Sequence, residues 1–534
     1  MFTKKRCFIY ALLLLIGLSF RLFIALRLPN DEPDDGRVYS QIARNILEQH
    51  VYSIESQAPY TPTLIRLPGY PLFVAAIYAA FGHGNNTAVR VAQAVLDTAT
   101  CILIALLAFQ WAVQEERKHR AAMIALVLAV VCPFTAIYVA TILTEVATNF
   151  LAVAMALTAT FAFKTTTRKR AITWWTVTGL LAGIAVFFRP DSGLFAAAIG
   201  LTLMLPSLRS FRKFRDATLY AAIFSLAFCL VLVPWTIRNR RLFHVFQPLA
   251  PAHAEMPGEF VPRGYLLWVR TWLDDERYVA PALWAIDTRQ VHVEDFPARA
   301  FDSKEERDRV AALFDKYNHP DGEESQQADE QQSSDDQSSD QDDSSGGDDE
   351  DQPEEEPEPE ESPEPADTNV EMTPEIDAGF AQIAQERVAH SWLRYYVLLP
   401  LKRAKTLWFD THSQYYPFNG ELLPLADLDH DIHQQYWLPL FTGLTWIYTL
   451  LGVLGGWLMW RSRDSNARRW LLMAALLMFL RLGFFATLEN PEPRYTVELF
   501  PFLIVLGSVG LAVVFNRITG SQDHPDNSEN PVIL

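Results

Sequence analysis

Residues 217–237 read ATLYAAIFSLAFCLVLVPWTI and contain no Asp, Glu, Lys or Arg. A helix of about 20 apolar residues is as long as the hydrocarbon core of a bilayer is thick. Basic residues precede this run at Arg212, Lys213 and Arg215, and Arg238 follows it. An uncharged run of this length between basic ends predicts a helix that spans a membrane.

Nine further apolar runs of similar length occur along the 534-residue chain. All ten candidate spans are about 8–27, 88–113, 121–139, 143–163, 171–189, 191–207, 217–237, 437–460, 470–487 and 496–515. The runs are continuous rather than alternating, which is the pattern of helices rather than of strands. We therefore expect an all-α polytopic membrane protein with about ten transmembrane helices.

The loops between the runs alternate in charge, and basic residues gather in every second one. They occur at 4–6, 117–120, 164–170, 209–215 and 461–469. Basic loops stay on the cytoplasmic side, so both termini are predicted to be cytoplasmic and residues 29–87 and 238–432 to lie outside. The apolar stretch 71–81 fits this alternation only as an interfacial or re-entrant helix. We expect the first run to be an uncleaved anchor, because no small-x-small cleavage site follows it.

The segment between the seventh and eighth runs is predicted to be an outer domain with an insert. Residues 321–367 hold 22 acidic residues and no Lys or Arg. This composition buries too little apolar surface to fold and predicts a disordered acidic insert. The expected divisions are a membrane domain 1–237 with its first outer loop 29–87, an extracytoplasmic domain 238–432, membrane helices 433–516 and a cytoplasmic tail 517–534.

Residues 374–410 show apolar side chains at three- and four-residue steps, interleaved with aromatic and basic ones. This spacing predicts helix, broken near Pro400 because proline interrupts helical hydrogen bonding. Two interpretations stay open. The segment is either an interfacial helix on the outer leaflet or the base of the outer domain.

The net charge of −18 belongs to the acidic insert. Without residues 321–367 the chain has 41 acidic residues against 45 basic ones. No folded segment carries a long basic stripe, so a nucleic-acid partner is disfavoured. The four cysteines all lie in apolar runs, and none lies between residues 238 and 431, which excludes a disulfide framework or a cysteine zinc site there.

The first outer loop opens with four carboxylates within five residues, at Asp31, Glu32, Asp34 and Asp35. Carboxylates repel one another, so such a cluster is typical of a cation site or of a catalytic base. A solvated acidic helix cap explains the same pattern. Asp35 and Tyr39 are four residues apart, so they share one face of a helix that presents Asp35 at its N-terminus.

Several arginines lie where a predicted span or short helix meets the outer surface, among them Arg66, Arg238 and Arg494. The planar guanidinium group donates two hydrogen bonds at once and suits a lipid phosphate. A snorkelling side chain explains the position of Arg66 equally well. Other ionisable residues lie within or at the ends of spans, where each is costly: Arg21, Asp97, Glu145, Arg189, Asp191 and Arg481.

The order of several short motifs resembles that of a known family. They are D-x-x-x-Y-x-x-I-A-R-N at 35–45, R-L-P-G-Y-P-L-F at 66–73, T-E at 144–145, R-P-D at 189–191, P-W-T-I-R-N at 234–239 and R-Y at 494–495. Over about residues 8–515, without the insert, the chain resembles the GT-C integral-membrane glycosyltransferases. Within them it is similar to the glycosyltransferase 39 type, which includes protein O-mannosyltransferases and lipid A aminoarabinose transferases.

The resemblance implies a GT-C fold, a polyprenyl-phosphate sugar donor and a glycan, lipid or protein acceptor on the outer face. It also implies that an acidic residue of the first outer loop is the catalytic base. Asp35 has the family spacing to Tyr39, and Asp34 is the second choice. The family often has Asp-Glu here, whereas Gly36 follows Asp35.

The expected reaction is a single displacement at the anomeric carbon. Arginines and a tyrosine are expected to bind the donor phosphate: Arg66, Arg189, Arg238, Arg494 and Tyr495. Glu145 is expected either to orient an arginine or to bind a metal. No cofactor or metal ligand is assigned, and the need for a divalent metal stays open.

Two alternatives to this enzyme stay open. A polytopic transporter or lipid-linked glycan flippase fits the number of spans but predicts two related halves. A glycan polymerase or ligase using the same carrier fits the late outer loop but leaves the acidic first loop unexplained. The expected location is a bacterial inner membrane.

Overall fold

The computed structural model describes residues 4–28, 34–320, 370–409, 438–462 and 464–518. The chain divides into two compact units. The first unit comprises residues 1–261, 402–487 and 491–534, and the second comprises 262–401 and 488–490. Residues 238–261 thus belong to the first unit. The acidic insert 321–367 lies outside the described residues.

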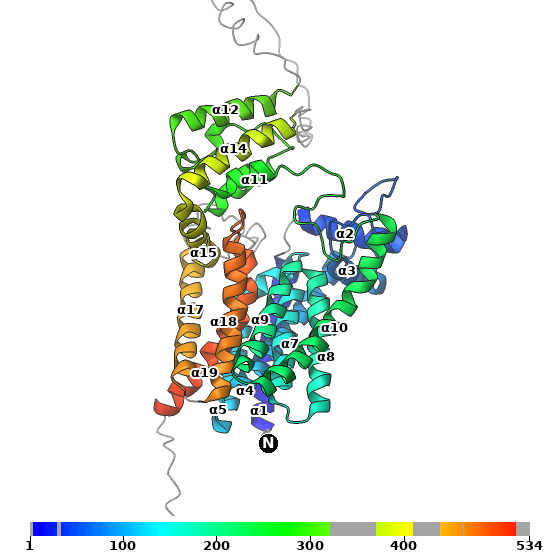
Figure 1. Cartoon of the computed structure of the whole chain (residues 1–534). Coiled ribbons are helices and arrows are strands. Elements are labelled where there is room, and N and C mark those ends of the chain that lie inside the picture. Colours follow the sequence, from blue (N-terminus) through cyan, green and yellow to red (C-terminus); the bar gives the residue numbers. More distant parts are fainter. Residues whose placement is uncertain (1–3, 29–33, 321–369, 410–437, 463, 519–534) are drawn as a thin grey trace, which may run out of the picture. The chain divides into compact units, whose positions relative to one another are not determined.

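The first unit is a bundle of long apolar helices that lie side by side (Figure 1). Within the described ranges, nine helices are long and apolar enough to cross a membrane. These nine correspond, with small differences at their ends, to α1 (Lys4–Arg27), α4 (Asn86–Trp111), α7 (Glu145–Lys164), α8 (Arg168–Phe188), α9 (Gly193–Met204), α10 (Phe211–Leu242), α17 (Leu438–Arg461), α18 (Ser465–Ala486) and α19 (Phe500–Ile518). The all-α polytopic fold predicted from the sequence is confirmed.

The one remaining predicted span, residues 121–139, is interrupted by a bend. Helix α5 (Glu115–Val130) and the segment Pro133–Ala140 are bent by 53° at the break. Pro133 begins the second piece, since proline has no amide hydrogen to donate into the preceding turn. Counting this bent pair as one span gives up to ten. The break leads directly into the residues that precede α7.

Two shorter helices follow α1 and lie at one end of the bundle (Figure 1). Helix α2 (Asp34–Glu48) buries Ile42 and Ala43, and α3 (Gly69–Phe81) is an apolar helix of 13 residues. A Cβ atom on Gly69 would lie 2.6 Å from the Phe187 carbonyl oxygen at the end of α8. Only glycine permits this contact, which fixes the loop before α3 against the bundle.

Helices α17 and α19 pack at backbone distance. A Cβ on Gly455 of α17 would lie 1.9 Å from the Leu506 carbonyl oxygen of α19, and one on Gly510 would lie 2.6 Å from the Gly455 Cα. Small residues at a helix contact allow the close approach on which packing inside a membrane depends. This contact holds α19, which follows directly on the segment that carries Arg494 and Glu498, against α17.

A buried ion pair joins α1 to α4. The Arg21 Nε atom lies 2.5 Å from the Asp97 carboxylate, and both side chains are fully buried. The guanidinium group also donates to the carbonyl oxygens of Gly17, Ala129 and Val130. These two intramembrane charges therefore stabilise the bundle.

The second unit has an aromatic core of its own. Helices α11 (Arg263–Arg270), α12 (Lys304–Asn318) and α14 (Pro374–His390) surround Trp268, Phe314 and Phe380. Ile376, Phe380 and Ile383 of α14 are buried in this core. The apolar stripe predicted over 374–410 is therefore, in α14, the inner face of a folded domain.

The break expected near Pro400 lies earlier in the chain. Helix α14 ends at His390, a π-helical turn covers Arg394–Leu398, and α15 runs over Leu399–Phe409. Pro400 lies just after this π-helical turn, and the chain stays helical from residue 392 to Phe409. The break therefore lies at Ser391, and just before Pro400 the helix only changes from π-helical to α-helical hydrogen bonding.

Candidate active site

Asp35 lies in the first turn of α2, as the spacing to Tyr39 predicts. Its Oδ1 atom is 2.8 Å from an Arg66 guanidinium nitrogen, and its Oδ2 atom is 3.6 Å from an Arg494 nitrogen. The carboxylate is 32% exposed, so it is open to a ligand. Residues separated by most of the chain thus converge on one carboxylate.

Arg66 is held by the loop between α2 and α3. The Tyr52 hydroxyl donates to the Arg66 carbonyl oxygen over 3.1 Å, and Leu64 and Leu67 on either side are buried. Gly69, three residues after Arg66, packs against the end of α8. The loop backbone is therefore anchored at several points, while the Arg66 side chain remains 26% exposed.

Arg494 is the second residue of the 3-10 helical segment Pro493–Leu499 that precedes α19. Its Nε atom pairs with the buried carboxylate of Glu492, and another nitrogen lies 3.4 Å from the Tyr495 hydroxyl. The guanidinium carbon lies 5.2 Å from the centre of the Tyr495 ring. Glu492 thus orients one edge of the guanidinium group, and the other edge faces Asp35.

A second cluster of charges lies deeper in the bundle. Arg189 contacts Glu145 at 2.9 Å, Asp191 at 3.2 Å and Glu498 at 3.5 Å. Arg481 pairs with Asp191 and lies 2.9 Å from Glu498. Two arginines therefore meet three carboxylates, and this pairing is what makes buried charge tolerable in a membrane bundle.

The deep cluster is linked to the Arg494 turn. The Arg481 Nε atom donates to the Tyr495 carbonyl oxygen over 2.7 Å, and the Arg189 guanidinium lies 5.3 Å from the Tyr495 ring centre. Arg481 of α18 and Arg189 at the end of α8 thus hold the turn from which Arg494 projects. Arg189 and Glu145 face each other here, and the expectation that Arg189 binds phosphate stays a prediction.

Tyr39 lies between the exposed carboxylate and the deep cluster. Its ring packs 5.0 Å from that of Tyr70, and its phenol is close enough to Asp35, Arg66, Glu145 and Arg189 to be influenced by their charges. Burial, with the Asp35 charge, raises the pKa of the phenol far above its usual value, so Tyr39 stays protonated.

Arg238 lies at the end of α10 in an aromatic setting. Its guanidinium carbon is 4.5 Å from the Trp235 ring centre, 5.1 Å from that of Tyr52 and 5.5 Å from that of Phe243. Arg238 and Tyr52 line a cleft of about 520 Å³. Since Tyr52 also holds the Arg66 backbone, the cleft adjoins the loop that carries Arg66.

Parts of the acidic loop lie outside the described residues. Asp31 and Glu32 are among these, and nothing is described of the Asp34 side chain, although Asp34 begins α2. Among the residues that the structure does describe, no group of three or more His, Cys, Asp or Glu side chains is arranged to hold a metal ion. The metal question therefore stays open.

Sequence reasoning missed Glu498, Glu492 and Tyr52. Glu498 is fully buried and accepts a hydrogen bond from Thr148 over 3.0 Å. The sequence could have revealed Glu498, because a carboxylate at this position lies inside a predicted apolar span and such a charge requires a partner. Tyr52 gave no signal, since a loop tyrosine is ordinary.

One known protein family matches part of this sequence. Residues 62–235 match the model of the family described as dolichyl-phosphate-mannose-protein mannosyltransferase. The match agrees with the resemblance read from the sequence: over residues 62–235 the chain is similar to this glycosyltransferase family. It contains Arg66, Glu145 and Arg189, whereas Asp35, Arg238 and Arg494 lie outside it.

Solved structures of two membrane enzymes are among those similar to the chain. The archaeal oligosaccharyltransferase AglB from Archaeoglobus fulgidus, in complex with an inhibitory peptide and a dolichol-phosphate, is 12% identical with a TM-score of 0.49. That match covers 97% of this chain and 51% of AglB, so the chain spans about half the length of AglB. ArnT from Cupriavidus metallidurans, bound to undecaprenyl phosphate, is 13% identical with a TM-score of 0.38, over 95% of this chain and 77% of ArnT. Comparison with curated protein sequences gave no match.

Proposed function

We propose that this chain is a glycosyltransferase that moves a sugar from a polyprenyl-phosphate donor to a glycan, lipid or protein acceptor at the outer face of a membrane. The observation that carries the proposal is the exposed Asp35 carboxylate held between Arg66 and Arg494. A base and two phosphate-binding cations are thus within reach of one ligand. The family match over residues 62–235 supports the same class.

The reaction follows from these charges. The acceptor hydroxyl oxygen attacks the anomeric carbon and gives its proton to Asp35, which acts as general base. The bond between that carbon and the phosphate oxygen breaks, and the polyprenyl phosphate leaves with the electron pair. The transition state has oxocarbenium character, as in other glycosyl transfers.

Arg66 and Arg494 have a second role in this scheme. In the structure both face Asp35, and a donor phosphate competes with the carboxylate for the two guanidinium groups. When the phosphate takes these contacts, Asp35 is free to accept a proton. The same arginines then stabilise the negative charge on the departing phosphate.

The remaining predicted residues take supporting roles. Arg238 binds the donor phosphate or the carrier chain next to it, and its position in the cleft beside Tyr52 supports this role. Glu145 orients Arg189, and Tyr495 supports the Arg494 guanidinium group through its ring and hydroxyl. Asp34 remains the reserve base, because it is adjacent to Asp35 at the start of α2.

A proteoliposome experiment separates this enzyme from a transporter or flippase. Purified full-length protein receives radiolabelled polyprenyl-phosphate sugars and a membrane-glycan extract, and both transfer and donor movement across the bilayer are measured. We expect label in the acceptor and no movement of intact donor. Movement without transfer from any donor would instead support a flippase, and transfer of long preassembled glycan chains alone would support a polymerase or ligase.

A further inference from the structure

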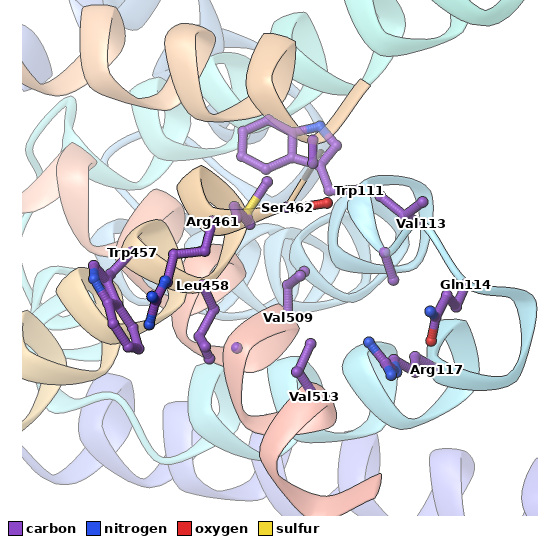
Figure 2. A pocket seen from close by; sticks show the side chains of 14 residues that line it. Trp111, Val113, Gln114, Arg117, Trp457, Leu458, Arg461, Ser462, Val509 and Val513 are labelled. Carbon is purple, nitrogen blue, oxygen red and sulfur yellow. The ribbon is translucent and has the colours of Figure 1, made fainter. Parts of the chain in front are cut away.

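A second cavity lies at the end of the bundle that the loop charges predict to face the cytoplasm. It has a volume of about 490 Å³ and is formed by the ends of α4 and α17 with α19 (Figure 2). Its charged lining residues are Arg117 and Arg461, and the fourteen described residues that line it include no Asp or Glu. The cavity is remote in sequence from Asp35 and Arg66, and the proposed function makes no use of it.

The wall between the two arginines is apolar. Figure 2 shows Arg461 and Arg117 on opposite sides of Val509 and Val513, with Leu458 beside Arg461. The Arg461 guanidinium also lies 4.9 Å from the Trp457 ring centre. Two cations on either side of an apolar wall fit an anion that carries a hydrocarbon tail.

The cavity is next to a surface that suits hydrocarbon. Leu450, Val453, Trp457 and Trp460 recur at three- and four-residue steps along α17, and each is 49% exposed or more. Trp457 belongs both to this stripe and to the cavity lining. An acyl chain along the stripe therefore brings its headgroup to the level of the tryptophans, where aromatic side chains gather at a membrane interface.

We propose that this cavity binds an anionic phospholipid, with its phosphate between Arg117 and Arg461 and an acyl chain against α17 and α19. Basic cavities between helices on the cytoplasmic side are suited to anionic lipid headgroups, because that leaflet is rich in them. A zwitterionic lipid offers no net charge to the two arginines. The site thus selects its lipid by charge and holds it by apolar contact.

Native mass spectrometry of the delipidated full chain tests this. The probes are phosphatidylglycerol and phosphatidylcholine with identical acyl chains. The test variant is R117Q/R461Q, and the matched control is R168Q/R170Q, which removes two exposed arginines at the start of α8. We expect wild type and the control to prefer phosphatidylglycerol, and R117Q/R461Q to bind it about 30-fold more weakly, from about 1 kcal/mol per basic residue.

Three further measurements test the cavity, the acyl chain and the C-terminal tail separately. Val513→Trp fills the cavity without removing charge and should also lose the preference, with thermal unfolding as the check on folding. Glycerol phosphate at equal concentration should not displace the lipid, since it has no acyl chain. A chain ending at residue 518 should bind the lipid as the full chain does. Equal binding of both lipids, unchanged binding by R117Q/R461Q, displacement by glycerol phosphate, or binding only after the tail is removed would each overturn the proposal.

Discussion

At the scale of single residues, the arrangement separates charges that face a ligand from charges that hold the bundle. Asp35, Arg66 and Arg494 are between 15% and 32% exposed, whereas Arg481 and Glu498 are fully buried. An exposed ion pair contributes little to stability, and a buried one that loses a partner is costly. The two groups therefore predict different outcomes when their members are replaced.

Arg66→Gln and Arg494→Gln should each lower the rate of sugar transfer by about 10²–10³, because removing one donor to a developing anion has that effect. The Michaelis constant for the donor should rise as well. Steady-state kinetics with a polyprenyl-phosphate sugar measures both. The control is Arg240→Gln, an exposed arginine near the same end of α10 as Arg238. A loss as large in the control would indicate a general effect of surface charge.

Arg481→Met should lower the free energy of unfolding by about 3–5 kcal/mol, because Asp191 and Glu498 lose a buried partner. Arg66→Met should lower it by less than about 1 kcal/mol, as is usual for exposed pairs. Thermal unfolding in one detergent compares the two variants. Similar losses would contradict the division into ligand-facing and structural charges.

The sequence predicts some of this site and not the rest. The four-residue step from Asp35 to Tyr39 placed the carboxylate at the start of a helix, because local spacing determines which side chains share a helical face. Sequence spacing gave no information on which partner Arg189 faces. Its contacts to Glu145 and Glu498 join helices that are far apart in the chain, and only the tertiary packing determines them.

At the scale of helices, length and hydropathy predicted the spans well, because each must match the bilayer. The position of the helix break within residues 374–410 was predicted wrongly, because the effect of proline was given too much weight. The helix continues through Pro400 after the π-helical turn Arg394–Leu398, and the chain is non-helical at Ser391 instead. Hydropathy also left the role of α14 open, since a domain core and a membrane surface require the same apolar stripe.

Gly455→Ala should lower the unfolding temperature, because its Cβ would lie 1.9 Å from the Leu506 carbonyl oxygen and α17 would have to move away from α19. Overpacking of this kind typically costs about 1–3 kcal/mol. The matched control is Gly443→Ala in the same helix, whose Cβ would meet nothing within 4 Å. Thermal unfolding of both variants tests the contact, and an equal effect of the two changes would contradict it.

At the scale of the whole molecule, the chain combines a helical bundle, a small aromatic domain and an acidic insert of different physical character. The bundle and the domain each have a buried core. The insert, by composition, has almost nothing to bury. The insert determines the sign of the net charge of the chain, and none of its residues belongs to the described site.

Deleting residues 321–367 should leave both the unfolding temperature and the rate of transfer unchanged, because a segment of this composition buries too little apolar surface to contribute to the fold. Size-exclusion chromatography, thermal unfolding and the transfer assay measure the consequences. A matched control replaces the segment with a neutral Gly/Ser linker of equal length. Loss of folded protein in both variants would show that the acidic residues have a structural role.

The central claim is that Asp35 accepts the proton of the acceptor hydroxyl. The most direct test measures transfer and donor binding side by side for wild type, Asp35→Asn and the control Glu48→Gln, an exposed carboxylate at the other end of α2. We predict that Asp35→Asn lowers transfer by about 10²–10⁴, as loss of a general base does, and still binds the polyprenyl-phosphate donor. Transfer by Asp35→Asn at the wild-type rate would contradict the account and move the base to another carboxylate, Asp34 first.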